Sequence, residues 1–362
     1  MYCSKCGIKI DISKNYCPEC GQLISGRARH MDRLKNAAAN MGKEDNSRNL
    51  KYWTESLAPQ YSGKNLTDIF GGSQIRTRKG NCLLISTRED FSLNCLDPGQ
   101  AQEILLSDLK LIYGIGSITE QKLRDEGYRS IRDLVSHPGY GQQARQFLVY
   151  LEQNQPKQLT KWISRWCPCS HPHQLLVSSF CDQKNFLLLD IETMGLYNMP
   201  VILIGVARIV NGSIRVKQYL ARSYEEEAAV LYLLNHNLSK NTVLVSFNGR
   251  MFDVPFIRQR LYYYSLVHDL DKIHLDILQF CRFFWKDQFD SFRLSSLEEN
   301  LLGIQRHQDL PGYMVPQFYQ QYLDNGNVDT LVPVINHNRQ DLVSLAKLFS
   351  LLHKQWKKFQ TS

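Results

Sequence analysis

The stretch FLLLDIET, Phe186 to Thr193, joins a continuous apolar run to two acids. A short apolar run of this kind is typical of a buried central strand. Because side chains alternate along a strand, Asp190 and Glu192 should point to one face at its C-terminal end. An acid on an apolar strand is costly unless it is paired or holds a metal. The end of this strand is therefore the first place where we expect a site.

The segments that follow continue an α/β pattern. VILIGVARI and SIRVKQYLA are two expected strands, and the Asn211-Gly212 pair between them is a strong hairpin signal. EEEAAVLYLLNHNL and DVPFIRQRLYYYSL are expected helices on either side of the strand TVLVSF, and a last helix contains NHNRQDLVSL. Ser295 and Glu298 have the spacing of a capping box. We therefore predict one α/β domain over residues 184–356.

Two more acids lie in these later segments. Asp253 follows the strand TVLVSF after a glycine turn, and Asp341 lies on the last helix with His337 one turn before it. Sites in α/β sheets form at the carboxyl edge, where these residues can join Asp190 and Glu192. Four carboxylates can hold two divalent cations, the arrangement used in metal-dependent phosphodiester hydrolysis. An all-oxygen ligand set favours Mg²⁺ or Mn²⁺.

Each of the later residues also has a purely structural interpretation. Asp253 can cap the helix that follows it, and Asp341 with His337 can form a solvated helix face. Asp276, in HLDILQF, is expected to cap or support the site rather than bind a metal. Asp190 is the acid for which packing offers the weakest explanation.

Three segments together resemble motifs I, II and III of the DEDD (DnaQ-like) exonucleases, a branch of the ribonuclease H-like superfamily. They read DIET from Asp190, NGRMFDVP from Asn248, and HNRQD from His337. The histidine stands at the spacing at which one subtype of these enzymes has tyrosine. About 170 residues of the chain are similar to the YprB-like predicted exonucleases.

The resemblance implies a mixed α/β sheet flanked by helices and a two-metal site for Mg²⁺ or Mn²⁺. Asp190 would bridge both ions, Glu192 and Asp341 would complete the first site, and Asp253 would hold the second ion. His337 would act as the general base or orient the attacking water. Contacts to the terminal nucleotide would come from Asn248 and Phe252. The implied activity is a 3′–5′ exonuclease, with DNA as the expected substrate and RNA left open.

Four cysteines near the start of the chain form a metal-type pattern. Cys3-x2-Cys6 and Cys17-x2-Cys20 are separated by ten residues, and each pair is followed by glycine. Four thiolates at this spacing can close a tetrahedral shell around one structural Zn²⁺, with no position left for water. Residues 1–22 are therefore predicted to be a small zinc ribbon.

Two further regions precede the α/β domain. Residues 23–100 are predicted to be a linker that contains a small β-hairpin. Residues 101–156 resemble a helix-hairpin-helix region, in which Gly114 and Gly116 would offer backbone N–H groups to a nucleic-acid phosphate. The alternative is a plain pair of helices used for packing.

Residues 157–183 are predicted to be an interdomain loop. Four residues of this segment are metal-ligand types: Cys167, Cys169, His171 and His173. One extended segment cannot easily wrap four side chains around one ion, so we do not assign a second metal site there.

The formal net charge of +8 is uneven along the chain, because residues 176–362 carry 19 basic and 18 acidic side chains, and residues 1–175 carry 24 and 17. This distribution is expected if the N-terminal half binds nucleic acid and the C-terminal half is catalytic and binds metal. The segment MYCSKCGIKI lacks the apolar core of a signal peptide, and the metal-type cysteines favour a reducing cytoplasm. A nuclease with a role in DNA repair is therefore expected, with a structure-selective endonuclease or a non-catalytic nucleic-acid-binding protein as alternatives.

Overall fold

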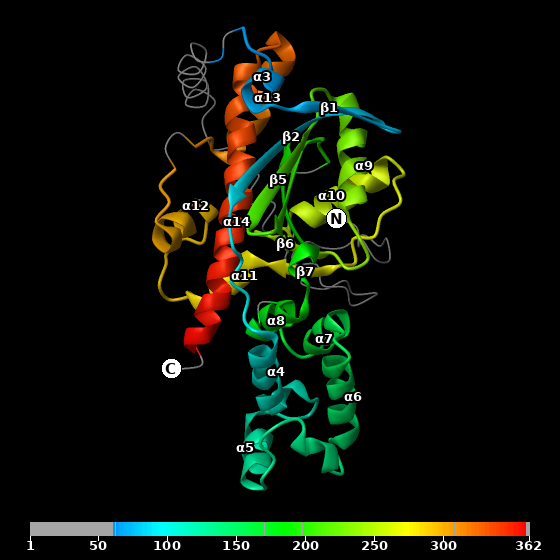
Figure 1. Cartoon of the computed structure of the whole chain (residues 1–362), viewed down its shortest axis with the longest axis vertical. Helices are drawn as coiled ribbons and strands as arrows, with labels where there is room; N and C mark the ends of the chain where they lie inside the picture. The colour runs from blue at the N-terminus through cyan, green and yellow to red at the C-terminus, as the bar shows by residue number, and fades with distance from the viewer. Residues whose placement is uncertain (1–60, 62, 170, 197, 307–308, 360–362) are drawn as a thin grey trace, which may run out of the picture.

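The computed structural model describes residues 61–359 except positions 62, 170, 197, 307 and 308. The zinc ribbon expected at residues 1–22, with Cys3, Cys6, Cys17 and Cys20, lies outside the described residues. The same applies to the part of the expected linker before residue 61. From residue 61 onward, a mixed sheet and a group of helices account for the fold (Figure 1).

Seven strands form one sheet in the order β1-β2-β5-β4-β3-β6-β7. Neighbouring strands are antiparallel except for the two parallel pairs β3–β6 and β6–β7. The expected α/β class with a mixed sheet is confirmed. The strands are β1 (Ser73–Thr77), β2 (Gly80–Asp90), β3 (Phe186–Thr193), β4 (Val201–Val210), β5 (Ser213–Leu220), β6 (Val243–Ser246) and β7 (Ile273–Asp276).

Strand β3 lies inside the sheet, between β4 and β6. Its apolar residues are buried on both faces, as a central strand requires. The predicted hairpin between β4 and β5 is confirmed, since Val210 pairs with Ser213 across a two-residue turn. Asn211 and Gly212 both have positive φ, 51° and 70°, as a type I′ turn demands.

The hairpin of β1 and β2 extends this sheet rather than standing apart in a linker. Strand β2 pairs with β5 over eight residues, from Leu83 opposite Leu220 to Asp90 opposite Ser213. Pairing with β5 gives the hairpin a partner strand that its own sequence does not reveal. Residues 73–90 are therefore part of the same sheet as the strands of the C-terminal region.

Helices cover both faces of the sheet (Figure 1). On one face, α11 (Ile277–Phe284) and α14 (Leu331–Phe359) pack against a core that includes Phe186 and Leu188. On the other face, α9 (Glu227–Asn237) and α10 (Asp253–Tyr263) pack against Leu187 and Leu189. Asp190 follows this alternation and faces α14. The remaining helices of this part are α3 (Leu66–Phe70), α12 (Leu294–Leu297) and α13 (Val315–Asn325).

A separate group of helices precedes β3 and has its own apolar core (Figure 1). Residues 157–183, expected to be a loop, instead contain most of α7 and all of α8. Pro156 stands at the start of α7, where its fixed φ favours a helix. Leu159, Trp162 and Ile163 are buried at helical spacing. The group consists of α4 (Pro98–Ser107), α5 (Ser117–Asp125), α6 (Gly141–Glu152), α7 (Pro156–Ile163) and α8 (Pro172–Val177).

No helix in the described part of the chain is long and apolar enough to cross a membrane.

Candidate functional site

The acids of β3 lie at its C-terminal end, as predicted. Asp190 pairs with Gly205 on β4, and Glu192 pairs with Leu203 just before the register shifts. A Cβ on Gly205 would collide with the side-chain oxygen of Asn338, which comes from α14. The missing side chain at position 205 therefore allows α14 to approach the sheet directly beside Asp190.

Asn338 fixes the orientation of the Asp190 carboxylate. Its Nδ2 donates to Asp190 Oδ2 over 2.7 Å, and its Oδ1 accepts from Gln218 Nε2 over 2.9 Å. Asn338 is fully buried. Because both ends of the amide are engaged, Asp190 cannot rotate without breaking a buried hydrogen bond. The sequence alone assigns Asn338 no role, although its place within HNRQD, three residues before Asp341, is a signal that could have indicated one.

Asp253 reaches the site from a tight loop after β6. Asn248 has a positive φ of 62° in this loop. Asp276 accepts hydrogen bonds from the backbone N–H groups of Asn248, over 2.8 Å, and Arg250, over 3.1 Å. This supporting role is the one expected for Asp276. Asp253 itself is the first residue of α10, with Phe252 in the N-cap position, so the expected capping role for Asp253 is wrong.

The predicted nucleotide contacts lie on the same loop. Asn248 is half-buried, and its backbone is held by Asp276. Phe252 is also half-buried and packs against Phe256, with 5.4 Å between the ring centroids. Their place beside Asp253 is compatible with substrate contacts, which stay a prediction.

On α14, Asp341 and His337 lie one turn apart, as predicted, within a network of charged groups. His337 Nδ1 lies 2.8 Å from Asp309 Oδ1, and its Nε2 lies 3.8 Å from Asp341 Oδ2. Arg306 Nη2 donates to Asp341 Oδ1 over 2.6 Å. The solvated face considered from the sequence is therefore wrong, because Asp341 and His337 are each largely enclosed.

Arg306 also reaches Glu298, which the sequence suggested as a helix-capping residue. Its Nη2 donates to Glu298 Oε1 over 2.8 Å, and Glu298 is fully buried. Helix α12 begins after Arg293 and has no side-chain cap, so the capping box of Ser295 and Glu298 is wrong. Arg306 and Asp309 come from an irregular segment without periodicity, and no sequence signal points to them.

The pKa of each of the four acids is raised, with burial as the largest cause in every case. Burial is the largest cause for Asp190, whose pKa lies well above its usual range, and the charges of Asp341, Glu192 and Asp253 add to it. Burial raises the pKa of Glu192 to about 8, against the opposing effect of His337. Burial and the charge of Asp276 raise the pKa of Asp253 to about 7. Burial also raises the pKa of Asp341, although His337 and Arg306 oppose this rise.

His337 shows the opposite balance. Burial alone would lower its pKa, but the hydrogen bond to Asp309 and the charges of Asp341 and Glu192 raise its pKa to about 9. At neutral pH, His337 is therefore a cation in this arrangement. Together with Arg306, it supplies positive charge on the α14 side of the acids.

The ligand chemistry of the cluster fits a hard divalent cation. All four acids offer oxygen, the donor that Mg²⁺ and Mn²⁺ prefer, and their mutual repulsion would be relieved by positive charge. The acids therefore match the cation in the type of donor atom. They do not match it in position, since no three His, Cys, Asp or Glu side chains within the described residues converge as a ligand set. Asp341 pairs with Arg306 instead.

The glycines of the expected helix-hairpin-helix region lie away from these acids. Gly114 has a positive φ of 87° and precedes α5, and Gly116 has open space around its Cα. Next to them, Tyr113 is exposed and stacks on Trp166 with 4.5 Å between the ring centroids. Figure 1 places α5 at the end of the helical group that is remote from the sheet. Phosphate binding by this turn stays a prediction.

The cysteine and histidine residues of α8 and the segment before it do not converge as a set of three metal ligands among the described residues. Cys169 is exposed, and Cys167 is half-buried. The Nδ1 atoms of His171 and His173 lie 2.9 Å apart, and His173 Nε2 lies 3.3 Å from Asp108. Burial lowers the pKa of His173 to about 3, so this histidine is neutral.

Comparison with known proteins agrees with the fold. Residues 187–353 match the family described as the RNase_H superfamily. The chain is 32% identical over 206 residues to the uncharacterized protein YprB of Bacillus subtilis (strain 168). The aligned region covers 55% of this chain and 49% of that protein. The chain thus spans about half the length of this relative. The mixed sheet, with the acids at the end of β3, agrees with the ribonuclease H-like fold that this match indicates.

Proposed function

We propose that this protein is a metal-dependent nuclease that hydrolyses phosphodiester bonds of nucleic acids. The observation that carries the proposal is a group of four acids in the segment that matches the RNase_H superfamily, of which Glu192 and Asp253 are buried and Asp190 and Asp341 half-buried. The four acids come from three elements, β3, α10 and α14, and the charges of Glu192, Asp253 and Asp341 all raise the pKa of Asp190. Such an accumulation of negative charge is costly in a protein interior and is typical of a functional site.

Asp190, Glu192, Asp253 and Asp341 would hold two Mg²⁺ or Mn²⁺ ions. When bound, such ions activate water and stabilise the charge that develops in phosphodiester cleavage. Asn338 keeps the Asp190 carboxylate in one orientation, and Asp276 holds the loop that carries Asp253. These fixed positions match the requirement that a catalytic site be preorganised.

His337 is the proposed group for orienting or deprotonating the attacking water. Asp309 engages its Nδ1 and leaves Nε2 directed toward Asp341. The pKa of about 9 makes His337 a proton donor in the present arrangement. The role as a base does not rest on this value, because the acids that raise it are themselves the proposed metal ligands.

The finer assignment follows the motif resemblance. We propose a 3′–5′ exonuclease that acts on DNA in the cytoplasm, with RNA open as a substrate. Asn248 and Phe252 would contact the terminal nucleotide. The zinc ribbon, with one Zn²⁺, and the Gly114-Gly116 turn would add grip that does not depend on sequence.

The test uses single-stranded DNA and RNA labelled at the 3′ or 5′ end, with Mg²⁺, Mn²⁺ or EDTA. The expected result is progressive shortening from the 3′ end that needs metal and is lost in Asp190→Ala. Asp287→Ala serves as the control, because Asp287 is an exposed acid outside the site. Cleavage of closed circular substrate would favour an endonuclease. Absence of cleavage, with equal nucleic-acid binding by all three proteins, would leave only a binding protein.

A further inference from the structure

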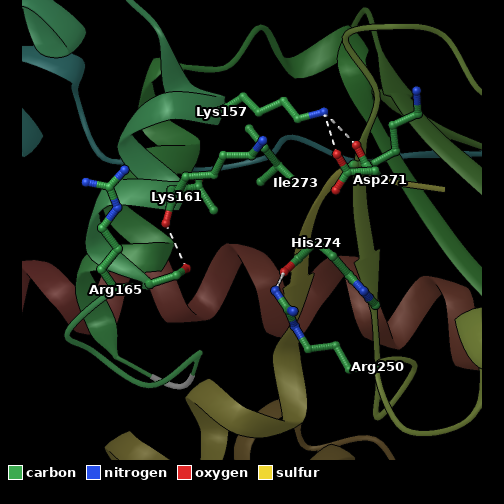
Figure 2. A pocket seen from close by; sticks show the side chains of 10 residues that line it. Lys157, Lys161, Arg165, Arg250, Asp271, Ile273 and His274 are labelled. Carbon is green, nitrogen blue, oxygen red and sulfur yellow. Dashed lines mark hydrogen bonds and ion pairs between the residues drawn. The ribbon is translucent and has the colours of Figure 1, made fainter. Parts of the chain in front are cut away.

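A basic cleft lies between α7 and the edge strand β7 (Figure 2). Its cavity volume is about 250 Å³. In Figure 2, Lys157, Lys161 and Arg165 approach it from the helix side, opposite Asp271 and His274. The lining consists of Lys157, Thr160, Lys161, Ser164, Arg165, Arg250, Asp271, Lys272, Ile273 and His274.

The charge of this lining is strongly one-sided, with five cationic side chains and one acid. The acid, Asp271, pairs with Lys157 over 3.1 Å, and Lys272 pairs with Asp269 over 2.6 Å. Lys161 and Arg165 are exposed and have no carboxylate partner in the described part of the chain. Two positive charges are therefore available to an anion at this place.

Two polar atoms of the lining residues are buried without a hydrogen-bond partner among the described residues. They are Arg250 Nε and Thr160 Oγ1. Buried polar atoms are nearly always paired, whereas the guanidinium of Arg250, a lining residue of the cleft, has one N–H group left without an acceptor in the described part of the chain. Phosphate oxygens form short, charge-assisted hydrogen bonds with guanidinium and ammonium groups.

The cleft is joined to the candidate active site through one loop. Arg250 lies in this loop, three residues before Asp253. Its guanidinium donates to the backbone carbonyl of His274, and its backbone N–H donates to Asp276. These two hydrogen bonds hold the loop to β7 beside the cleft. The same loop leads to Asp253, one of the acids of the candidate active site.

We propose that this cleft binds a backbone phosphate of the nucleic-acid strand whose end enters the candidate active site. The inference rests on the proposed nuclease function, since it assigns the path of that substrate. A phosphate at Lys161, Arg165 and Arg250 would fix the strand without reading its bases. The recognised chemistry is a phosphodiester in a chain, not a free nucleotide.

The experiment measures binding of a short labelled single-stranded DNA by fluorescence anisotropy without added Mg²⁺ or Mn²⁺, over a series of salt concentrations. Omitting these ions separates binding from cleavage and leaves the Zn²⁺ of the proposed ribbon in place. Lys161→Gln/Arg165→Gln should bind several-fold more weakly than the wild type for every base composition. The slope of log K against log salt should fall by about 0.7 for each phosphate of the single strand that the variant no longer neutralises.

Two variants sharpen the test. Arg215→Gln/Lys217→Gln removes the same charge from exposed positions on β5, which is four positions from β7 in the sheet order, and should leave the slope unchanged. Asp271→Asn removes the acid of the cleft and should tighten binding, while Lys157 keeps its bond of 2.8 Å to the backbone carbonyl of residue 271. Thermal melts check that each variant folds.

The proposal would be overturned if Lys161→Gln/Arg165→Gln bound DNA with the same affinity and the same salt dependence as the control variant Arg215→Gln/Lys217→Gln. Stabilisation of the wild type by inorganic phosphate without any DNA binding would also overturn it, with free phosphate as the ligand. The proposed function fails separately: a wild type that never cuts, yet binds DNA through Lys161 and Arg165, refutes the nuclease and retains the phosphate site.

Discussion

Arg306 Nη2 donates a hydrogen bond of 2.6 Å to Asp341 Oδ1, the last of the four acids of the candidate site. The same guanidinium holds Glu298 over 2.8 Å and Asp309 over 2.8 Å. One arginine therefore balances three carboxylates. It ties the acid on α14 to an irregular segment that the sequence motifs do not include.

Replacing Arg306 should destabilise the protein strongly. Arg306→Met leaves the fully buried Glu298 without its countercharge. Breaking a buried pair in this way costs about 3–5 kcal/mol of the free energy of unfolding. Urea unfolding measures the loss.

A second substitution identifies the cause. Arg306→Met/Glu298→Gln should be more stable than Arg306→Met alone, because the stranded charge is gone. Arg132→Met provides a surface control, since Arg132 pairs with Glu152 and both are about half exposed; its cost should stay below about 1 kcal/mol. A loss of similar size for Arg306→Met and Arg132→Met would contradict the explanation.

The strand-borne part of the site is predictable from the sequence. Alternation alone places Asp190 and Glu192 on one face, and the apolar run before them identifies β3. Strand periodicity depends only on neighbouring residues, so it can be recognised in a single sequence. The turn at Asn211-Gly212 is equally local, because its two positive φ angles restrict the choice of residues.

The rest depends on contacts between segments far apart in the chain. Arg306 and Asp309 lie in an irregular segment, and only the folded chain brings them to α14. The β1–β2 hairpin is visible in the sequence, but the pairing of β2 with β5 is not, because the two strands lie far apart in the chain and neither sequence identifies its partner. Pro168 and Pro172 favour a loop over residues 157–183, although Pro172 in fact opens α8.

Gly205 should be intolerant of even one methyl group. In Gly205→Ala, the added Cβ would collide with Asn338, which must then move away from Asp190. Overpacking of this kind costs about 1–3 kcal/mol, and metal-dependent activity should fall along with it. Thermal unfolding and the cleavage assay measure the two effects.

Gly139→Ala is the matched control, because Gly139 is exposed and a Cβ there comes no nearer than 3.5 Å to another side chain, that of His137. Its stability should change by only a few tenths of a kcal/mol. Full activity of Gly205→Ala would show that the orientation of Asp190 by Asn338 is not needed.

Divalent metal should stabilise the folded protein. Mg²⁺ or Mn²⁺ would relieve the repulsion that raises the pKa of Asp190 and its neighbours. At a metal concentration 100 times the dissociation constant, the expected gain is about 2.7 kcal/mol. Differential scanning fluorimetry with increasing metal measures this gain, with KCl of equal ionic strength as a reference.

The same titration with Asp190→Asn should show a much smaller shift, whereas Asp287→Asn should behave like the wild type. Without metal, Asp190→Asn should be at least as stable as the wild type, since the burial and the neighbouring charges that disfavour the ionised carboxylate no longer act at position 190. An equal metal response in all three proteins would place the metal elsewhere.

His274 should make the protein sensitive to acid in a defined way. Burial, with a smaller effect of Arg250, lowers its pKa to about 3, and the neutral ring lies 2.7 Å from Ser246 Oγ. In the unfolded chain its pKa returns to about 6.5. Below this pH the unfolded chain takes up a proton that the folded protein does not, so stability falls as pH falls. Between pH 6.5 and pH 5 the loss approaches about 2 kcal/mol.

The buried acids titrate in the opposite direction, so the prediction concerns the difference between the wild type and His274→Gln. Glutamine keeps a polar group near Ser246 but does not titrate, and the contribution of the acids cancels in the comparison. The advantage of the wild type in free energy of unfolding should therefore shrink as pH falls below about 6.5. Urea unfolding of both proteins across this range measures it. A constant difference would mean that His274 carries the same charge in the folded and unfolded states.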